Sequence, residues 1–380
     1  MKKYIDNKYS KILFLDITSH GDKAWFCNSY FSALFEVDLD SLEFTLLSWL
    51  PEEKEMTFQS YTAIAYYEGI LVIAPRNEHR ILIYDLGKNK IEREIPIDIS
   101  IMGDESNVFN LFSRIAIIGN FAYILPGRYP AIIKLDLVDY SISLIDAWYK
   151  SNKDAVVDEG RTIFSAAGTM NDDILLPFWQ VGKMMIFHTK EENWDIVQVP
   201  QYEKFIFDIA IHKNEAYVSS SLKNTICKIV NNEANEWLDL SHYDGCGTGI
   251  LRTCIAGDEM MVFSNQVKSI LAINLKTQEV IESIACKNEV SEEQKNAAYV
   301  DNQFLCAKKL EDKILACSVY EGMLYVYSIS ERKWSKKELV VPQKYEKDVE
   351  KRVKNLYMNG FMYEAQDGIL EGWLDWLTEN

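Results

Sequence analysis

Residues 204–240 read KFIFDIAIHKNEAYVSSSLKNTICKIVNNEANEWLDL, and this stretch decides the fold. It contains short apolar runs separated by polar residues that favour turns, at 205–211, 216–220, 225–230 and 236–240. Runs of this length with turn residues between them predict antiparallel strands joined by tight connections. We therefore interpret the stretch as one four-stranded unit.

The unit recurs along the chain at intervals of roughly forty to fifty residues. In each copy a two-residue polar turn separates the first two apolar runs, and these turns are Gly21-Asp22, Glu68-Gly69, Gly119-Asn120, Asn171-Asp172, Lys213-Asn214, Gly257-Asp258 and Glu311-Asp312. A repeat of this period is typical of a propeller, in which each unit forms one blade. The sequence predicts an all-β fold, a β-propeller of seven four-stranded blades.

The third strand of several units ends on a short polar side chain, as at Asp38, Asp85, Asp136 and Asn274. Asp and Asn at such places accept hydrogen bonds from the backbone that follows and so begin a turn. We expect these residues to be structural. His188, Val230 and Ser328 replace them in three units.

Tryptophan opens the predicted fourth strand in three units, at Trp194, Trp237 and Trp334. An aromatic residue stands at a similar place in Kelch-repeat propellers, where it packs between blades. Over residues 11–341 the chain therefore resembles Kelch-like and WD-like propellers in architecture, although it lacks the Gly-Gly pair of Kelch units and the Gly-His and Trp-Asp marks of WD repeats. The resemblance implies the fold and carries over no functional residue.

The C-terminal part of the chain differs in character from the repeats. A highly charged stretch is followed by a predicted hairpin about Asn359-Gly360 and by a predicted helix over 366–380. We assign 1–345 to the propeller, and 346–380 to a charged segment, a hairpin and a closing helix packed on it. The helix would cover the seam between the first and last blades, where strand edges need protection. Two alternatives are a helix that docks a partner and a hairpin that adds strands to a further partial blade.

Net charge and cysteine content limit the partners. The 380 residues carry a net charge of −17, which repels nucleic acid and anionic lipid, so we expect neither a nucleic acid nor a membrane as partner. The seven cysteines include no C-x-x-C pair, and four of them lie in apolar runs. We expect no disulfide framework, no metal and no cofactor. The N-terminal stretch does not resemble a signal peptide, so we expect a cytoplasmic protein. The sequence does not indicate an oligomeric state.

Ligands of propellers are expected on one face of the ring. Loops between second and third strands share that face with the connections between blades, and pockets form at the mouth of the central channel. Six residues at similar positions after their second strands are the predicted ligand contacts: Asn28, Arg76, Arg128, Trp179, Asn265 and Tyr320. Amide and guanidinium donors beside aromatic rings suit a protein, a peptide, a carbohydrate or an anionic small molecule.

The same face holds weak candidates for acid–base catalysis. Three connections between blades are long, at 100–110, 150–161 and 286–302. The candidates on this face are Asp104, Asp158, Glu159 and His242. Facing carboxylates can cleave a saccharide or peptide, but a chain with 57 Asp and Glu residues contains acidic pairs by chance. We therefore predict a non-catalytic recognition or scaffold propeller, with a hydrolase or lyase as the alternative.

Overall fold

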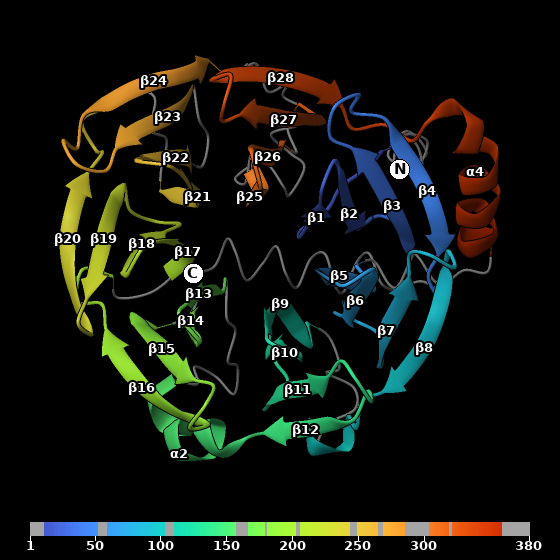
Figure 1. The fold of residues 1–380 in the computed structure, drawn as a ribbon, viewed down its shortest axis with the longest axis horizontal. Helices are drawn as coiled ribbons and strands as arrows, with labels where there is room; N and C mark the ends of the chain where they lie inside the picture. Colours follow the sequence, from blue (N-terminus) through green and yellow to red (C-terminus); the bar gives the residue numbers. More distant parts are fainter. Residues whose placement is uncertain are drawn as a thin grey trace.

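Seven four-stranded antiparallel sheets form a ring in the computed structural model (Figure 1). The structure describes residues 11–51, 59–102, 110–156, 166–178, 181–202, 206–243, 249–264, 269–285, 304–318 and 321–358. In each sheet the first strand lies at the centre of the ring and the fourth at the rim (Figure 1). The predicted seven-bladed β-propeller is confirmed.

The strands follow the chain blade by blade. Blade 1 consists of β1 (Thr18–His20), β2 (Lys23–Cys27), β3 (Ala33–Asp38) and β4 (Phe44–Trp49). Blade 2 consists of β5 (Tyr61–Tyr67), β6 (Ile70–Pro75), β7 (Arg80–Asp85) and β8 (Lys90–Pro96). Blade 3 consists of β9 (Phe112–Ile118), β10 (Phe121–Pro126), β11 (Ile132–Asp136) and β12 (Ile142–Ile145). Blade 4 consists of β13 (Gly168–Met170), β14 (Asp173–Pro177), β15 (Lys183–His188) and β16 (Asn193–Gln198).

The remaining blades have the same order. Blade 5 consists of β17 (Ile206–His212), β18 (Glu215–Ser220), β19 (Thr225–Val230) and β20 (Glu233–Asp239). Blade 6 consists of β21 (Ile250–Ala256), β22 (Glu259–Ser264), β23 (Ser269–Asn274) and β24 (Val280–Ala285). Blade 7 consists of β25 (Phe304–Leu310), β26 (Lys313–Ser318), β27 (Met323–Ser328) and β28 (Lys333–Glu338). Among the described residues three helices lie outside the blades: η1 (Ser100–Met102), α2 (Ala147–Val156) and α4 (Gln343–Met358).

All seven predicted polar turns join the first and second strands of their blades. The first residue of each turn has a positive φ, including Lys213 at 56° and Glu311 at 47°. Tight hairpin turns use residues with positive φ because the backbone twist of such turns matches that of the flanking strands. The turns therefore fix the blade count and place their own residues on the face opposite the predicted ligand contacts.

The predicted turn carboxylates are confirmed as structural. Asp38 Oδ1 accepts hydrogen bonds from Ser41 N at 2.7 Å and from Ser41 Oγ at 2.9 Å, and these bonds lower the pKa of Asp38. Asp85, Asp136 and Asn274 accept equivalent bonds from the backbone that follows them. The tryptophan positions need one correction. Trp194 and Trp334 are the second residues of their strands, but Trp237 lies in the middle of β20, because a turn at Asn231-Asn232 starts that strand at Glu233.

Blade 4 has a histidine at the turn position and uses it as a charged bridge. His188 Nδ1 lies 3.0 Å from Asp173 Oδ1, and His188 Nε2 lies 3.4 Å from Asp195 Oδ2. Burial opposes protonation of His188, but the two carboxylates outweigh it and raise the pKa of the imidazole. Protonated His188 therefore joins the second and fourth strands of the blade.

We expect His188→Gln to lower the free energy of unfolding at pH 5 by about 0.5 kcal/mol and to change it much less at pH 9. The folded-state pKa is raised above the unfolded value of about 6.5, so the stabilisation is complete below that value and is lost as the pH rises through the folded pKa. Urea unfolding at both pH values measures the effect, and His242→Gln, at an exposed histidine, is the control. An equal loss at both pH values would contradict the ionic role.

The hydrophobic core is divided among the blade interfaces. Within the described residues, one buried apolar cluster lies between each pair of neighbouring blades, including the pair formed by blades 7 and 1. Trp334 of blade 7 contributes to one of them, because its Nε1 donates to Ser283 Oγ of blade 6 at 2.7 Å and its ring packs on Phe263. Each blade is therefore held mainly by its two neighbours.

The N-terminal segment closes the ring. Lys11 forms an antiparallel bridge with Val340, and Ile12 N donates to Leu339 O at 3.0 Å. Ile12 and Phe14 are buried in the same cluster as Leu339. The seam between the first and last blades is thus covered by residues that precede β1.

Helix α4 corrects the interpretation of the C-terminal part. The charged stretch is helical and lies beside β4 (Figure 1), where Val349 is fully buried and Arg352 stacks 4.6 Å above the ring of Trp49. Tyr345 and Val349, four residues apart and therefore on one side of the helix, both pack into the cluster between blades 7 and 1. The strand that would lead into the predicted turn at Asn359-Gly360 is not present, since α4 continues to Met358. The predicted turn at 359–360 and helix over 366–380 lie outside the described residues.

One predicted loop is partly a helix as well. The connection expected over 150–161 belongs to α2 as far as Val156. Trp148 in its first turn is fully buried and donates from Nε1 to Ile145 O at 2.9 Å. The loop prediction failed there because it did not include the tryptophan that anchors the helix between blades 3 and 4.

Candidate binding site in the central channel

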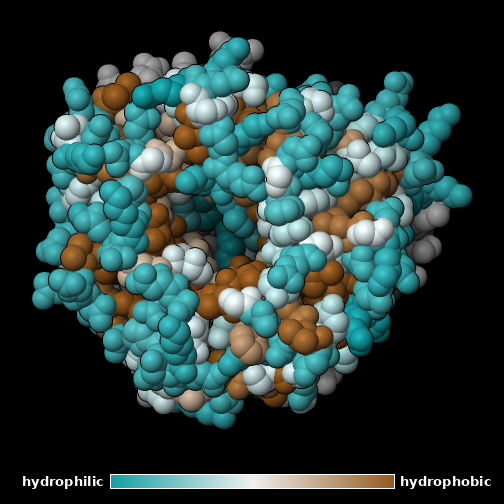
Figure 2. Space-filling view, viewed as in Figure 1, coloured by the Kyte–Doolittle hydropathy of each residue, from teal (hydrophilic) through white to brown (hydrophobic). Residues whose placement is uncertain are grey.

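A cavity of about 400 Å³ lies on the axis of the ring. Its wall is made by the inner strands β9, β13, β17, β21 and β25, together with residues just before β1 and β13. Figure 2 shows the hollow at the centre of the ring, with hydrophilic residues inside it. This volume is in the range of small-molecule pockets.

Charged residues of the wall share one position in the repeat, five residues before the polar turn. In blade order this position holds Asp16, Ala63, Arg114, Ala166, Asp208, Arg252 and Cys306. All of them except Ala63 line the cavity. Because each inner strand ends at its polar turn on the opposite face, a position five residues earlier lies toward the face of the predicted ligand contacts.

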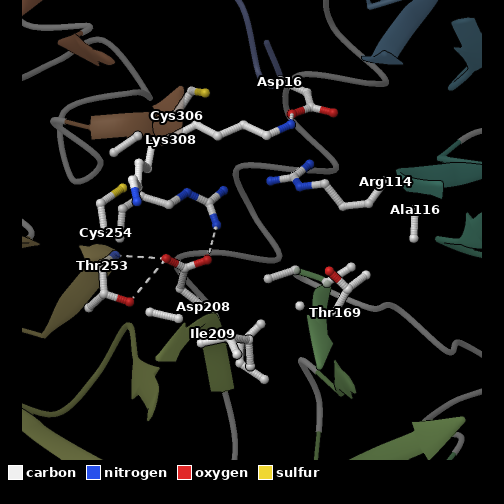
Figure 3. A pocket seen from close by; sticks show the side chains of 18 of the residues that line it. Asp16, Arg114, Ala116, Thr169, Asp208, Ile209, Thr253, Cys254, Cys306 and Lys308 are labelled. Carbon is white, nitrogen blue, oxygen red and sulfur yellow. Dashed lines mark hydrogen bonds and ion pairs between the residues drawn. The ribbon is translucent and has the colours of Figure 1, made fainter. Parts of the chain in front are cut away.

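Asp208 and Arg252 form a buried pair between blades 5 and 6 (Figure 3). Asp208 Oδ2 accepts from Thr253 N at 2.7 Å, and Asp208 Oδ1 lies 3.4 Å from Arg252 Nη1. The Arg252 guanidinium also stacks 4.5 Å above the ring of Phe207. Burial raises the pKa of Asp208 against the opposing effect of Arg252, and burial lowers the pKa of Arg252. Removal of either partner would therefore leave a charge in a site with little water.

Asp16 repeats this arrangement between blades 1 and 2. Its Oδ2 accepts from Ile64 N of β5 at 3.3 Å, and its Oδ1 accepts from Lys308 Nζ at 2.8 Å. In both places a carboxylate of one blade binds a backbone amide of the next inner strand and one cation. The two carboxylates that line the cavity are thus engaged in holding blades together.

Arg114 of β9 differs from the other cations of the wall. It is half-buried, and its Nη1 donates to the backbone oxygen of Ser113 at 2.7 Å. Across the described ranges no carboxylate lies within ion-pair distance of its guanidinium. Figure 3 shows the guanidinium pointing into the cavity, toward the space between Asp208 and Lys308.

Two cysteines complete the wall, Cys254 and Cys306, and both are buried. Burial raises the pKa of Cys306 to about 11 and raises that of Cys254 as well. Both thiols are therefore protonated at neutral pH and are poor nucleophiles. Among the described residues, no three His, Cys, Asp or Glu side chains are grouped so that they could hold a metal ion.

Two of the predicted contacts meet at the entry to β9. Arg76 O accepts from Leu111 N at 2.8 Å, and Arg128 N donates to Asn110 O at 2.8 Å. Asn110 and Leu111 directly precede the strand that carries Arg114. The structure therefore brings the loops of Arg76 and Arg128 together at the start of β9, although neither residue lines the cavity itself.

Asn28 lies elsewhere, buried beneath the N-terminal segment. Its Oδ1 accepts from Leu13 N at 3.0 Å, and its Nδ2 donates to Lys11 O at 3.4 Å. Both ends of this amide thus hold the segment that closes the ring.

Of the other predicted site residues, the structure describes His242, which does not line the cavity. His242 is exposed in the turn after β20. Six lie outside the described residues: Asp104, Asp158, Glu159, Trp179, Asn265 and Tyr320. The predicted contacts do not include the channel wall, because they were chosen from loops alone. Alignment of the seven units on their turns would have revealed charged residues inside otherwise apolar inner strands.

No protein-family model and no curated protein matches this sequence. Solved structures do match it. Virginiamycin B lyase from Staphylococcus aureus is 11% identical, with 82% of this chain and 93% of that chain covered and a TM-score of 0.59. The Swd1 β-propeller domain of Myceliophteria thermophila is 9% identical, with 86% and 96% covered and a TM-score of 0.57. The designed protein Ika8 is 11% identical, with 87% of each chain covered and a TM-score of 0.55.

The chain is a seven-bladed β-propeller. Identities this low show the fold alone, and the matching structures include a lyase as well as a designed protein. In the part of the chain that the structure describes, none of the helices has the length and apolar character of a membrane span.

Proposed function

We propose that this propeller is a non-catalytic recognition or scaffold module that binds its ligand at the loop face of the central channel. The observation that carries the proposal is the meeting of the Arg76 and Arg128 loops at Asn110-Leu111, next to the strand that bears Arg114. Guanidinium groups at a channel mouth suit carboxylates, phosphates and the hydroxyls of a peptide or carbohydrate.

The chemistry of the wall supports recognition over catalysis. A general base needs a carboxylate or imidazole with room for a substrate proton. Of the described wall residues, Asp16 and Asp208 are the carboxylates, and each accepts a backbone amide and pairs with a cation. Neither has the freedom of a catalytic base. The hydrolase or lyase hypothesis and the cytoplasmic location stay predictions.

We expect the double substitution Arg76→Ala and Arg128→Ala to abolish ligand binding and to leave the blades folded. Both residues lie in loops, so the change removes two cations from the mouth and no inner strand. Purified protein is applied to an array of defined peptides and glycans, and bound ligands are compared between the natural chain and the variant.

The matched control removes two arginines away from this face. Arg93 lies on the outer strand β8, and Arg332 lies in the turn between β27 and β28 on the opposite face. Arg93→Ala with Arg332→Ala should keep the array pattern of the natural chain. Equal binding by the loop variant would overturn the proposal, and a change of mass in a bound peptide or glycan would favour the hydrolase or lyase.

A further inference from the structure

We propose that the channel cavity binds a small organic oxyanion, a carboxylate or phosphate compound, whose anionic group pairs with Arg114. This inference rests on the proposed recognition function and names the chemical class of its ligand. The shared chemistry is an oxygen anion that accepts paired hydrogen bonds from a guanidinium.

The charge of the cavity is opposite to that of the protein. The chain carries a net charge of −17, yet the described wall residues include Arg114, Arg252, Lys308 and Lys309 against Asp16 and Asp208. A basic wall inside an acidic protein concentrates the field at this point and attracts anions that the outer surface repels.

Arg114 is the guanidinium of the wall that has no carboxylate partner among the described residues, and Lys309 is a second, exposed wall cation without an ion pair there. Lys308 pairs with Asp16 at 2.8 Å, and Arg252 lies 3.4 Å from Asp208. Among the described residues Arg114 has only the backbone oxygen of Ser113 as hydrogen-bond acceptor, and its guanidinium, a group with five N–H donors, points into the cavity (Figure 3). The charge of Arg114 also disfavours the charged form of Arg252, so an anion between them would relieve the repulsion.

The space beside Arg114 suits a small ligand. The wall next to it is built from small side chains, among them Ala116, Ala167 and Gly168. Together they leave the cavity of about 400 Å³. A small organic anion fills such a volume, whereas a folded partner would contact only its rim.

Isothermal titration calorimetry at low salt tests the inference, with citrate and inorganic pyrophosphate as anionic probes and maltose as the neutral probe. We expect the natural chain to bind at least one anion at a single site and not to bind maltose there. Arg114→Gln should weaken that affinity by about 10- to 100-fold, as expected for the loss of a charged hydrogen-bonding partner. The two anions distinguish a carboxylate site from a phosphate site.

A second variant keeps Arg114 but occupies its guanidinium with a carboxylate of the protein. Ala116→Glu places a carboxylate two residues along the same strand, on the same face, and should remove anion binding to a similar extent. Arg93→Gln, on an outer strand, is the matched control and should bind as the natural chain does. Circular dichroism and thermal melting establish that each variant is folded. If Arg114→Gln does not fold, the result for Ala116→Glu decides.

Two outcomes would overturn the inference: unchanged anion affinity in a folded Arg114 or Ala116 variant, or no anion binding by the natural chain up to about 10 mM. In either case binding of an array ligand that depends on Arg76 and Arg128 would leave the recognition function standing. Anion binding that depends on Arg114, with no array ligand dependent on the loop arginines, would instead retain the channel site and remove the proposed loop contacts.

Discussion

Arg252→Leu is expected to reduce the free energy of unfolding at pH 8 by about 3–5 kcal/mol, the usual loss when a buried ion pair is broken on one side. The substitution leaves Asp208 buried beside β21 with Thr253 N and without its cation. Leucine fills part of the space but cannot balance the carboxylate. Chemical denaturation measures the loss.

The effect of Arg252→Leu should depend on pH in a defined direction. Burial already raises the pKa of Asp208, and loss of Arg252 removes the largest of the charges that oppose this rise, while the more distant Arg114 remains. A carboxyl whose folded pKa is raised takes up a proton more readily in the folded state, so stability falls as the pH rises from the unfolded pKa of about 3.9 through the folded value. The variant should therefore be closer to the natural chain at pH 5 than at pH 8.

A double-mutant cycle measures the interaction energy between Asp208 and Arg252 apart from the contacts that each makes with other residues. Arg252→Leu with Asp208→Leu should lose less stability than the two single changes together, because no charge is left buried. The loss that remains belongs to Thr253 N, which no longer has its acceptor. Strict additivity would show that the contact between Asp208 and Arg252 has no energetic role.

Gly182→Ala is the second change with a large expected effect, a loss of about 3 kcal/mol or more. A Cβ atom on Gly182 would lie 1.7 Å from the backbone oxygen of Tyr202 and 3.3 Å from that of Val199. The connection from blade 4 to blade 5 packs directly on this loop, and Val199 N donates to Gly182 O at 2.9 Å. Since backbone atoms cannot rotate away, the connection between the two blades or the loop of Gly182 would have to shift.

Gly87→Ala is the matched control for this prediction. Its Cβ would be 3.4 Å from Asp85 Oδ1, an ordinary contact. We expect the thermal midpoint of Gly87→Ala to stay near that of the natural chain, and that of Gly182→Ala to fall by several degrees. Similar midpoints for the two variants would show that the connection between the blades yields at little cost.

The fold could be predicted from sequence because the information is local and repeated. Each polar turn needs only two residues and a positive φ, and it recurs with every blade. Helix α4 could not be predicted with the same ease. Its charged sequence has few apolar residues, and Val349 is buried only because the cluster of blade 1 lies beside it.

The channel wall depends on long-range contacts that local patterns do not report. In the sequence Asp208 cannot be distinguished from other acidic residues, because its partners, Thr253 N and Arg252, lie on β21 of the next blade. Arg114 is recognisable only when strands from several blades are placed around one axis. Loop positions such as Arg76 and Arg128 could be predicted to share a face of the ring, because the order of strands within a blade determines on which face each loop lies.

The bridge between Lys11 and Val340 also sets the order in which the molecule can form. Almost the whole chain separates these two residues, so the contact has a high cost in loop-closure entropy and cannot nucleate folding. During synthesis the segment around Ile12 and Phe14 has to wait for Leu339, with its apolar side chains unprotected until blade 7 has been made. We therefore expect ring closure to follow the synthesis of blade 7 and to be slow, because it depends on this long-range contact.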